Sequence, residues 1–269
     1  MSRFSRILVN TLRYCIIHTV NKVSKIWDNS PATSELSENL VHIWRGRIED
    51  SALDVDKLHM EILSQEEKKR ASRLRSAKDK MRFIVSRSLL RKSLSHYLET
   101  APSEVRFTYN KYGKPDIDPE YHPEKIKFNL SHSENLALYA ITQNREIGID
   151  VEYIRKVDKA DKIVKRFFSK EEGEFYHSQP KNKKNWAFFT LWTRKEAYSK
   201  ARGMGIGLPT KEFDLQLVPP EVDHSNDIRT RNKDSKWSLI NIEVDSDYLA
   251  ALATEGNDFE ISHWKFDDI

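Results

Sequence analysis

The sequence predicts a mixed fold in which helices and strands intermingle, of the α+β or α/β class. Two observations support this prediction. Short stretches in which apolar and polar residues alternate, as they do in strands, recur along the 269 residues. Stretches with helical spacing and helix-start signatures lie between them. The chain has no short-period repeat and no phosphate-binding loop of the G-x-G-x-x-G or Walker A type.

Residues 1–40 are predicted to form an N-terminal extension and linker. The first 25 residues mix apolar side chains with Asn10, Arg13 and His18, and the segment is too short and too polar to span a bilayer. It faintly resembles a signal peptide, although no clean cleavage site follows. A transit peptide, an amphipathic surface helix and a dispensable or misassigned leader all remain open. The next stretch, "NSPATSELSEN", has the composition of a linker.

The formal net charge of +4 arises in this extension. Residues 1–28 hold five basic residues and one acidic residue, which account for the whole excess, so residues 29–269 are neutral overall. A neutral body argues against a nucleic-acid partner, and the polar extension argues against stable membrane insertion. Cys15 is the only cysteine, so neither an intramolecular disulfide nor a cysteine metal cage can form. This composition suits the reducing cytosol, and we expect a cytoplasmic protein.

The body begins with a predicted strand and continues with two predicted helices. "LVHIWRGRI" alternates as a strand does. In the region that follows, Ser64 and Glu67 form a capping-box signature. One stripe further along is apolar at helical spacing: Phe83, Leu90, Leu94 and Tyr97. The opposite face is rich in Arg and Lys, which are either simply solvated or bind an anion.

The later elements alternate between strand and helix. "VRFTYNKYGKPDI" predicts strand-like residues around a Gly-Lys-Pro turn, and "IKFNLSHSENLALYAITQ" predicts two strands separated by a polar break at residues 131–133. "EIGIDVEYI" predicts another strand and "DKADKIVKRFF" a helix. Ser169 and Glu172 form a second capping box, and "KKNWAFFTLWTRKEAYSKARG" predicts a helix closed by Gly203. Strand-like pieces complete the chain: "EFDLQLV", "KWSLINIEV" and "YLAALAT".

The strand "IGIDVE" carries two acids, Asp150 and Glu152, among apolar residues. Residues two apart on a strand point to the same side, so both carboxylates project together while Ile149 and Val151 point the other way. Two carboxylates this close repel each other unless a cation lies between them. Mg²⁺ is such a cation, since it prefers carboxylates, waters and phosphate oxygens. Exposed acids at the end of a strand are the alternative interpretation.

The predicted helix "LWTRKEAYSKARG" offers a third acid. Trp192, Glu196 and Lys200 are spaced by four residues and therefore share one face. Glu196 and Lys200 either belong to a site or form an ordinary surface pair worth a few tenths of a kcal/mol.

The segment "FNLSHS" sets His132 between two serines. A serine hydrolase is not indicated, because adjacent Ser and His cannot form a triad relay and the G-x-S-x-G elbow is absent. The hydroxyls, the imidazole and nearby backbone N–H groups could instead bind an anion. A structural loop histidine is the alternative.

The order and spacing of these segments resemble the 4′-phosphopantetheinyl transferases. "YGKP", "FNLSHS", "GIDVE" and "WTRKEAYSK" follow one another as in the long, two-lobed members that act on many carrier proteins. The resemblance covers roughly residues 41–255, the patterns G-x-D-x-E and W-x-x-K-E-A-x-x-K are complete, and "RFFSKEE" and "GIGLP" add similarity. The extension and the polar loop near residues 219–235 depart from the family pattern without touching a motif.

The resemblance implies an α+β fold of two similar lobes related by pseudo-two-fold symmetry, with the active site between them. The lobes would comprise residues 41–144 and 145–269, and the protein would be a monomer. The family transfers the 4′-phosphopantetheine arm of coenzyme A to a serine of an apo acyl or peptidyl carrier protein and releases adenosine 3′,5′-bisphosphate. Fatty-acid, polyketide and nonribosomal peptide synthesis all use such carriers, and the sequence does not select among them.

The resemblance also implies roles for individual residues. Asp150, Glu152 and Glu196 would bind Mg²⁺. Residues that would contact coenzyme A are Ser131 and His132 at its phosphates, Lys114 near its adenosine end, and Arg70 and Arg82 from the basic helical face. Glu196 would accept the proton of the carrier serine, directly or through metal-bound water, or would act only as a ligand. Lys200 would stabilise the departing bisphosphate.

The acidic carrier protein requires a basic docking face. "RKVDKADKIVKRFF" and "KNKKNW" are candidates for it, or carry ordinary surface charge. Rival interpretations of the whole chain are a Mg²⁺-dependent phosphodiesterase with the same three carboxylates, a nucleic-acid-binding module, and an inactive homologue.

Overall fold

The structure is a computed structural model, and it describes residues 27–29, 35–48, 59–123, 125–204, 227–228 and 237–266. Residues 1–26 and 30–34 of the predicted extension and linker, "EFDLQLV", "GIGLP" and most of the polar loop that follows lie outside the described residues, whereas residues 28–29 of the extension form a short strand, β1. Helices and strands alternate along the described chain, which confirms the α+β prediction. None of the helices among the described residues is long and apolar enough to cross a membrane.

The first sheet has five strands in the order β1-β11-β2-β6-β5. Strands β2, β6 and β5 are antiparallel neighbours, whereas β11 runs parallel to β2 and to β1. The bounds are Asp28–Asn29 for β1, Leu40–Arg47 for β2, Ile126–Ser133 for β5, Leu136–Gln143 for β6 and Glu260–Lys265 for β11. The sheet therefore combines strands from both ends of the described chain.

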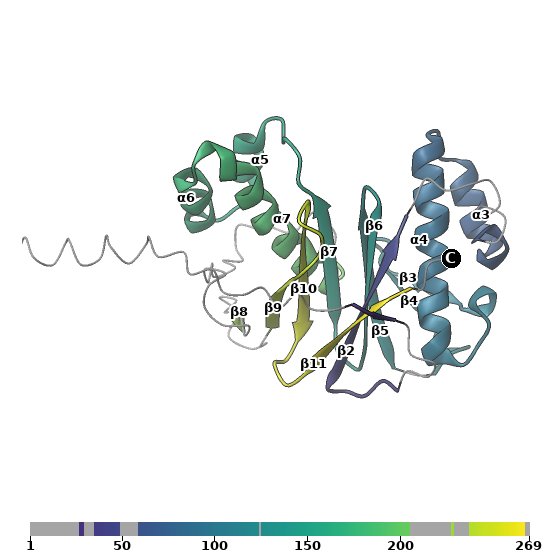
Figure 1. Cartoon of the computed structure of the whole chain (residues 1–269). Coiled ribbons are helices and arrows are strands. Elements are labelled where there is room, and N and C mark those ends of the chain that lie inside the picture. Colours follow the sequence, from purple (N-terminus) through teal and green to yellow (C-terminus); the bar gives the residue numbers. More distant parts are fainter. Residues whose placement is uncertain are drawn as a thin grey trace, which may run out of the picture.

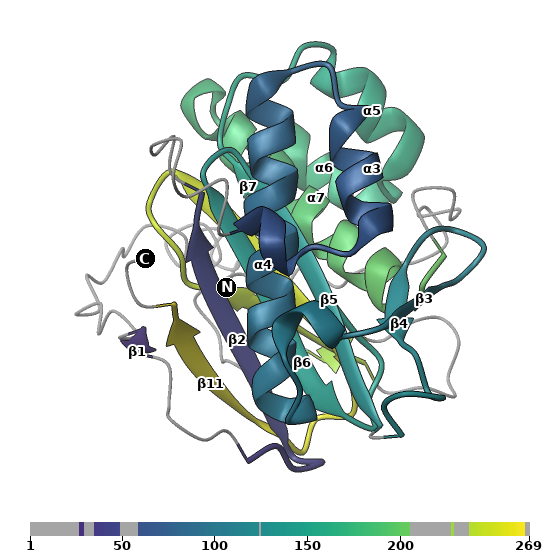
Figure 2. The same ribbon diagram turned by 90° about the vertical axis from the view of Figure 1, so that its right-hand side faces the viewer.

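Helix α4 (Ala77–Leu98) covers the outer face of this sheet, with the shorter α3 (Gln65–Ser72) beside it (Figure 2). Both helices occur where the sequence predicts them. The predicted capping box is confirmed, since Ser64 accepts from the Glu67 N–H and Glu67 accepts from the Ser64 N–H. The side chains that α4 and the sheet bury together include Trp44, Leu90, Leu94, Phe128 and Tyr139.

The second sheet has four strands in the order β7-β10-β9-β8 and is antiparallel. The bounds are Ile147–Tyr153 for β7, Asp227–Ile228 for β8, Trp237–Ile242 for β9 and Tyr248–Glu255 for β10. Helix α7 (Lys184–Ala201) packs on its outer face, and Gly203 follows it with φ +62°, as predicted for a helix end.

Two short helices, α5 (Ala160–Phe167) and α6 (Lys170–Ser178), connect β7 to the 3₁₀ turn η3 (Lys181–Lys183) and α7. The second predicted capping box is confirmed at the start of α6, where Ser169 and Glu172 exchange their hydrogen bonds. The apolar side chains of α5 and α6 pack with those of α7 in a separate cluster, which includes Phe168 and Phe188.

The connection between α4 and β5 holds the 3₁₀ turn η2 (Pro102–Glu104) and a small hairpin of β3 (Phe107–Tyr109) and β4 (Pro115–Ile117). The predicted polar break at residues 131–133 is wrong. These residues are the last part of β5, because they pair with β6 in register, and the turn falls at Glu134, which has φ +47°.

The two sheets pack face to face in a four-layer order, α4, first sheet, second sheet, α7 (Figure 1). Side chains such as Val41, Leu138, Ile149 and Leu252 fill the space between the sheets. Strands β5 and β7, each at an edge of its own sheet, lie against each other. This arrangement brings "FNLSHS" next to "GIDVE".

Candidate active site

The acids of β7 face α7. Ile149 and Val151 are buried between the two sheets, so the intervening side chains point to the opposite side, as the alternation predicts. The neighbouring Gly148 allows α7 to approach the strand closely. A Cβ atom at this position would lie 2.1 Å from the backbone oxygen of Ala197 and 2.3 Å from the backbone nitrogen of Ala201. The absence of a side chain here therefore sets how near α7 lies to the acids.

Asp150 is buried and shares its Oδ1 atom between two donors. Lys200 Nζ lies 2.6 Å from this oxygen, and the Ser131 hydroxyl donates to it over 2.9 Å. Lys200 also donates to Ser131 Oγ at 2.8 Å and to the backbone oxygen of Ile149 at 3.3 Å. The second carboxylate oxygen, Oδ2, is buried without a hydrogen-bond partner. Burial raises the pKa of Asp150, and the positive charge of Lys200 opposes that rise.

Glu152 is held by its Oε2 atom. The Ser133 hydroxyl donates to this oxygen over 3.0 Å, and Arg155 donates to it over 3.1 Å. Ser133 in turn accepts a hydrogen bond from the backbone N–H of Tyr153 at 3.1 Å. Glu152 is thus tied both to its own strand and to β5 of the other sheet.

Glu196 lies on the face of α7 that meets these acids. Burial and the negative charge of Asp150 raise the pKa of Glu196 to about 7, with a smaller contribution from Glu152 and an opposing one from Lys200. Three carboxylates are therefore close enough to influence one another. A carboxylate with this pKa can accept or release a proton near neutral pH.

His132 is exposed to solvent beside this cluster, although protein atoms surround much of its ring. That surrounding, followed by the positive charges of Lys200 and Arg82, lowers the pKa of the imidazole. Arg82 itself donates to Glu134 at the turn after β5, and its Nε atom is buried without a partner. The structure therefore brings His132 near Lys200 and Glu152, and Arg82 near His132.

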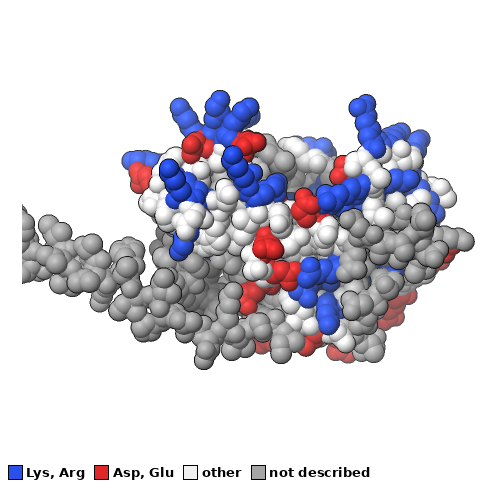
Figure 3. Space-filling model, turned by 45° about the horizontal axis from the view of Figure 1, so that its top comes forward, with Lys and Arg blue, Asp and Glu red and all other residues white. Residues whose placement is uncertain are grey.

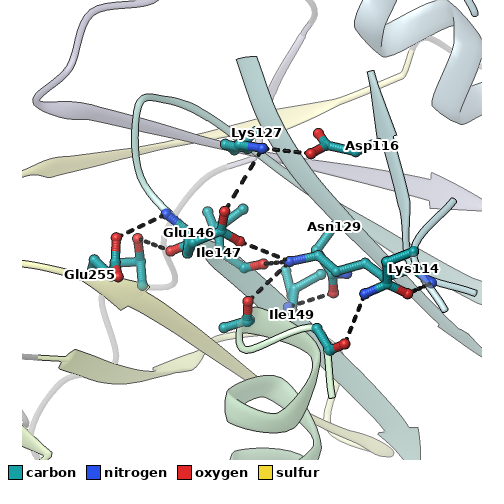
Figure 4. Close-up of polar contacts among 12 residues, drawn as sticks. Lys114, Asp116, Lys127, Asn129, Glu146, Ile147, Ile149 and Glu255 are labelled. Carbon is teal, nitrogen blue, oxygen red and sulfur yellow. Dashed lines mark hydrogen bonds and ion pairs between the residues drawn. The ribbon is translucent and has the colours of Figure 1, made fainter. Parts of the chain in front are cut away.

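Lys114 lies in the turn before β4, and its side chain is directed toward Glu146 and Ile147 (Figure 4). Lys114 Nζ donates to Glu146 Oε2 at 3.2 Å, to the Ile147 backbone oxygen at 3.3 Å and to the Ala201 backbone oxygen at 3.0 Å. It borders a cavity of about 250 Å³ and ties the β3–β4 hairpin to β7 and α7. Arg70 is exposed, with its guanidinium 5.2 Å from the centre of the Phe83 ring.

A divalent metal fits the acidic cluster by its chemistry. Mg²⁺ prefers carboxylate oxygens, and Asp150 supplies one that is buried and lacks a partner. As they stand, however, no three His, Cys, Asp or Glu residues of the described chain are arranged to hold a metal ion. The ammonium group of Lys200 neutralises Asp150 instead. The carboxylates of Asp150, Glu152 and Glu196 are the side chains that would hold the metal.

Sequence reasoning missed two residues of this site, Gly148 and Arg155, and it treated Ser133 only as a possible donor to an anion, not as a partner of Glu152. A glycine inside a strand often marks a close backbone approach, so the signal for Gly148 was present. The signal for Ser133 was its spacing of two from Ser131, which places both hydroxyls on one side of β5. Nothing in the local sequence indicates that Arg155 contacts Glu152.

Lys and Arg side chains gather along the upper rim of the molecule, and acidic side chains lie between them (Figure 3). The exposed basic residues between β7 and α6 are Arg155, Lys156, Lys159, Lys162, Lys165, Arg166 and Lys170. The first of these contacts Glu152, so the basic surface reaches the acidic cluster.

Comparisons with known proteins give one consistent result. A family model described as the 4′-phosphopantetheinyl transferase superfamily matches residues 146–253, and one described as the N-terminal part of 4′-phosphopantetheinyl transferase matches residues 54–144. The 4′-phosphopantetheinyl transferase HetI of Nostoc sp. is 35% identical over 89% of this chain and 98% of its own length. The 4′-phosphopantetheinyl transferase Sfp of Bacillus subtilis is 30% identical over 74% of this chain and 85% of its own length.

Proposed function

Because the chain belongs to the 4′-phosphopantetheinyl transferase superfamily, we propose that it moves the 4′-phosphopantetheine arm of coenzyme A to a serine of an apo acyl or peptidyl carrier protein. Adenosine 3′,5′-bisphosphate is the second product, and the activity is that of a holo-acyl-carrier-protein synthase with Mg²⁺ as cofactor. The observation that carries the proposal is the meeting of Asp150, Glu152 and Glu196 with Lys200 where β5, β7 and α7 converge.

Asp150, Glu152 and Glu196 are the proposed metal ligands. Bound Mg²⁺ neutralises the pyrophosphate of coenzyme A and makes its phosphorus more electrophilic. Burial of Asp150 and its orphaned Oδ2 support this assignment, because a buried carboxylate oxygen without a partner is costly unless a cation joins it.

The reaction forms one bond and breaks one. The carrier serine oxygen attacks the phosphorus that bears the pantetheine arm, and the bond from that phosphorus to the bridging oxygen breaks. Glu196 accepts the serine proton. Lys200 stabilises the negative charge that develops on the departing bisphosphate. Because Ser131, Ile149 and Asp150 each accept a hydrogen bond from Lys200, the ammonium group would have to exchange one of these contacts for the bisphosphate.

His132, Ser131 and Arg82 are the proposed contacts for the phosphates of coenzyme A. The nearness of His132 to Lys200 and Glu152, and of Arg82 to His132, supports the assignment of both. Ser131 is at present engaged with Asp150 and Lys200, so its role requires that it turn toward the ligand. Lys114 would lie near the adenosine end, beside the cavity that it borders.

Arg70, which is exposed on α3, would reach coenzyme A only from the outer end of that ligand. The carrier protein would dock on the basic surface between β7 and α6, since carrier proteins of this class are acidic.

We also propose that the enzyme acts as a monomer in the cytoplasm. Its two halves would be lobes related by pseudo-two-fold symmetry and divided near residue 144, except that β11, from the later part of the chain, joins the first sheet. The support for this symmetry is that each sheet carries one long helix on its outer face, α4 on the first and α7 on the second.

The deciding experiment incubates the purified full chain with coenzyme A, Mg²⁺ and an apo carrier protein, and then weighs the carrier. A mass gain equal to one phosphopantetheinyl group is expected. No gain on any of several apo carriers would overturn the proposal. Hydrolysis of coenzyme A without a carrier would point instead to a phosphodiesterase.

Variants then test the residue roles. Asp150→Ala and Glu196→Ala are expected to abolish transfer while the circular dichroism spectrum stays native. Glu174→Ala is the matched control, because Glu174 is an exposed acid on α6 that pairs only loosely with Lys170 at 3.9 Å. Near wild-type activity of Asp150→Ala with Mg²⁺ would refute the metal assignment.

A further inference from the structure

Strands β5 and β7 are joined by side chains rather than by a backbone ladder. Asn129, Ser131 and Ser133 are spaced by two along β5 and therefore share one side of it. Asn129 Oδ1 accepts from the Ile149 N–H at 2.9 Å, and Ser133 Oγ accepts from the Tyr153 N–H at 3.1 Å. These side chains partner N–H groups of β7 on the edge that does not face β10. The edge strand is thus fixed from the other sheet.

The Ser133 hydroxyl has one acceptor for its hydrogen, the Glu152 carboxylate. A serine hydroxyl has a single hydrogen to donate, and its lone pairs accept. Because one lone pair of Ser133 takes the Tyr153 N–H, the hydrogen is free to turn toward Glu152 Oε2, which lies 3.0 Å away. Ser131 is arranged in the same way, since it accepts from Lys200 and donates to Asp150 Oδ1.

The carboxylates of Asp150 and Glu152 therefore each use only one of their two oxygens in these hydrogen bonds. Protein donors engage Oδ1 of Asp150 and Oε2 of Glu152, and the other oxygen of Asp150 is buried without a partner. The second donor to Glu152, Arg155, is half exposed and contributes little by itself. Ser133 is the donor that the fold holds rigidly.

We infer that Ser133 is a positioning residue for the metal: it holds Oε2 of Glu152 and so leaves Oε1 as the oxygen that would meet the metal. The inference rests on the proposed Mg²⁺ site and adds the residue that orients one of its ligands. Partners that orient metal ligands typically change metal affinity by about 10- to 100-fold when they are removed.

The test measures metal binding directly. Mn²⁺ is titrated into the full chain in the presence of coenzyme A, and free Mn²⁺ is followed by electron paramagnetic resonance. For Ser133→Ala the dissociation constant is expected to rise about tenfold, and Ser133→Thr, which keeps the hydroxyl, is expected to restore it. In transfer assays the Mg²⁺ concentration for half-maximal rate should rise similarly, while the rate at saturating Mg²⁺ recovers.

Ser238→Ala is the matched control, because it removes a serine hydroxyl that donates to the Gly256 backbone oxygen on the other side of the sheet. Its Mn²⁺ affinity is expected to be that of the wild type even if its melting temperature falls. Ser133→Ala with wild-type Mn²⁺ affinity would overturn the positioning role and leave the proposed metal site standing. A wild-type protein that binds no Mn²⁺ even with coenzyme A would overturn both.

Discussion

Gly148→Ala tests whether the approach of α7 to β7 sets the geometry of the site. The new Cβ would stand 2.1 Å from the Ala197 backbone oxygen. Because normal carbon–oxygen contacts are longer, α7 would have to recede by roughly 1 Å. Such a shift would stretch the 2.6 Å contact between Lys200 and Asp150 beyond hydrogen-bonding distance.

The cost of this overpacking is expected at the upper end of the usual range, about 3 kcal/mol of unfolding free energy, because the clash is with backbone. A displacement of this size is expected to slow transfer about 100-fold. Urea unfolding followed by tryptophan fluorescence gives the first quantity, and carrier modification under native conditions gives the second.

Gly173→Ala is the matched control. Its Cβ would meet only Val164 Cγ1 at an ordinary 3.8 Å, and replacing a glycine inside helix α6 should stabilise the protein by about 0.5–1 kcal/mol. Its transfer rate should not change. If Gly148→Ala unfolds at the same urea concentration as the wild type and keeps its rate, α7 does not pack on β7 as described here.

Three further outcomes are expected. Burial alone would raise the pKa of Glu67, but the ion pairs with Arg87 and Arg91 outweigh burial and lower this pKa. The ion pairs therefore stabilise the folded protein fully at pH values above the ordinary glutamate pKa of about 4.3. This stabilisation is lost as the pH falls through the lowered pKa that Glu67 has in the folded protein. Glu67→Gln should therefore cost about 3 kcal/mol in urea unfolding at pH 7, with a smaller difference from the wild type at pH 3, and an equal difference at both pH values would contradict this. Lys200→Met should abolish transfer and lower the free energy of urea unfolding by about 2 kcal/mol, because it leaves Asp150 buried without its cation. Lys200→Arg should recover this stability. If Lys200→Met were as stable as the wild type, the ion pair between Lys200 and Asp150 would not be formed. Chelation of divalent cations with EDTA should stop carrier modification and added Mg²⁺ should restore it, whereas continued modification in EDTA would exclude a metal requirement.

The parts of the site that the sequence predicts are those that depend on local periodicity. The alternation of residues along β7 predicted that Asp150 and Glu152 share one side of the strand. The helical spacing of α7 predicted that Glu196 and Lys200 share one face of the helix. That the two faces meet at Gly148 depends on tertiary packing, which no single segment encodes.

Contacts between distant segments escaped prediction for the same reason. The pairing of Lys200 with Asp150 joins residues 50 positions apart. Lys114, expected at coenzyme A from its motif, donates to acceptors on β7 and α7 that only the folded chain brings near it. Strand β11 was not predicted from the sequence, and its place beside β2 likewise depends on tertiary packing.

The parallel pairing of β11 with β2 has a consequence for biosynthesis. β2 leaves the ribosome well before residues 260–265, which pair with one of its edges. Until they emerge, β2 exposes unpaired backbone groups of the kind that promote aggregation. The first sheet is therefore complete only after residues 260–265 have emerged, and a separately expressed fragment of residues 41–144, which lacks them, should be prone to aggregation.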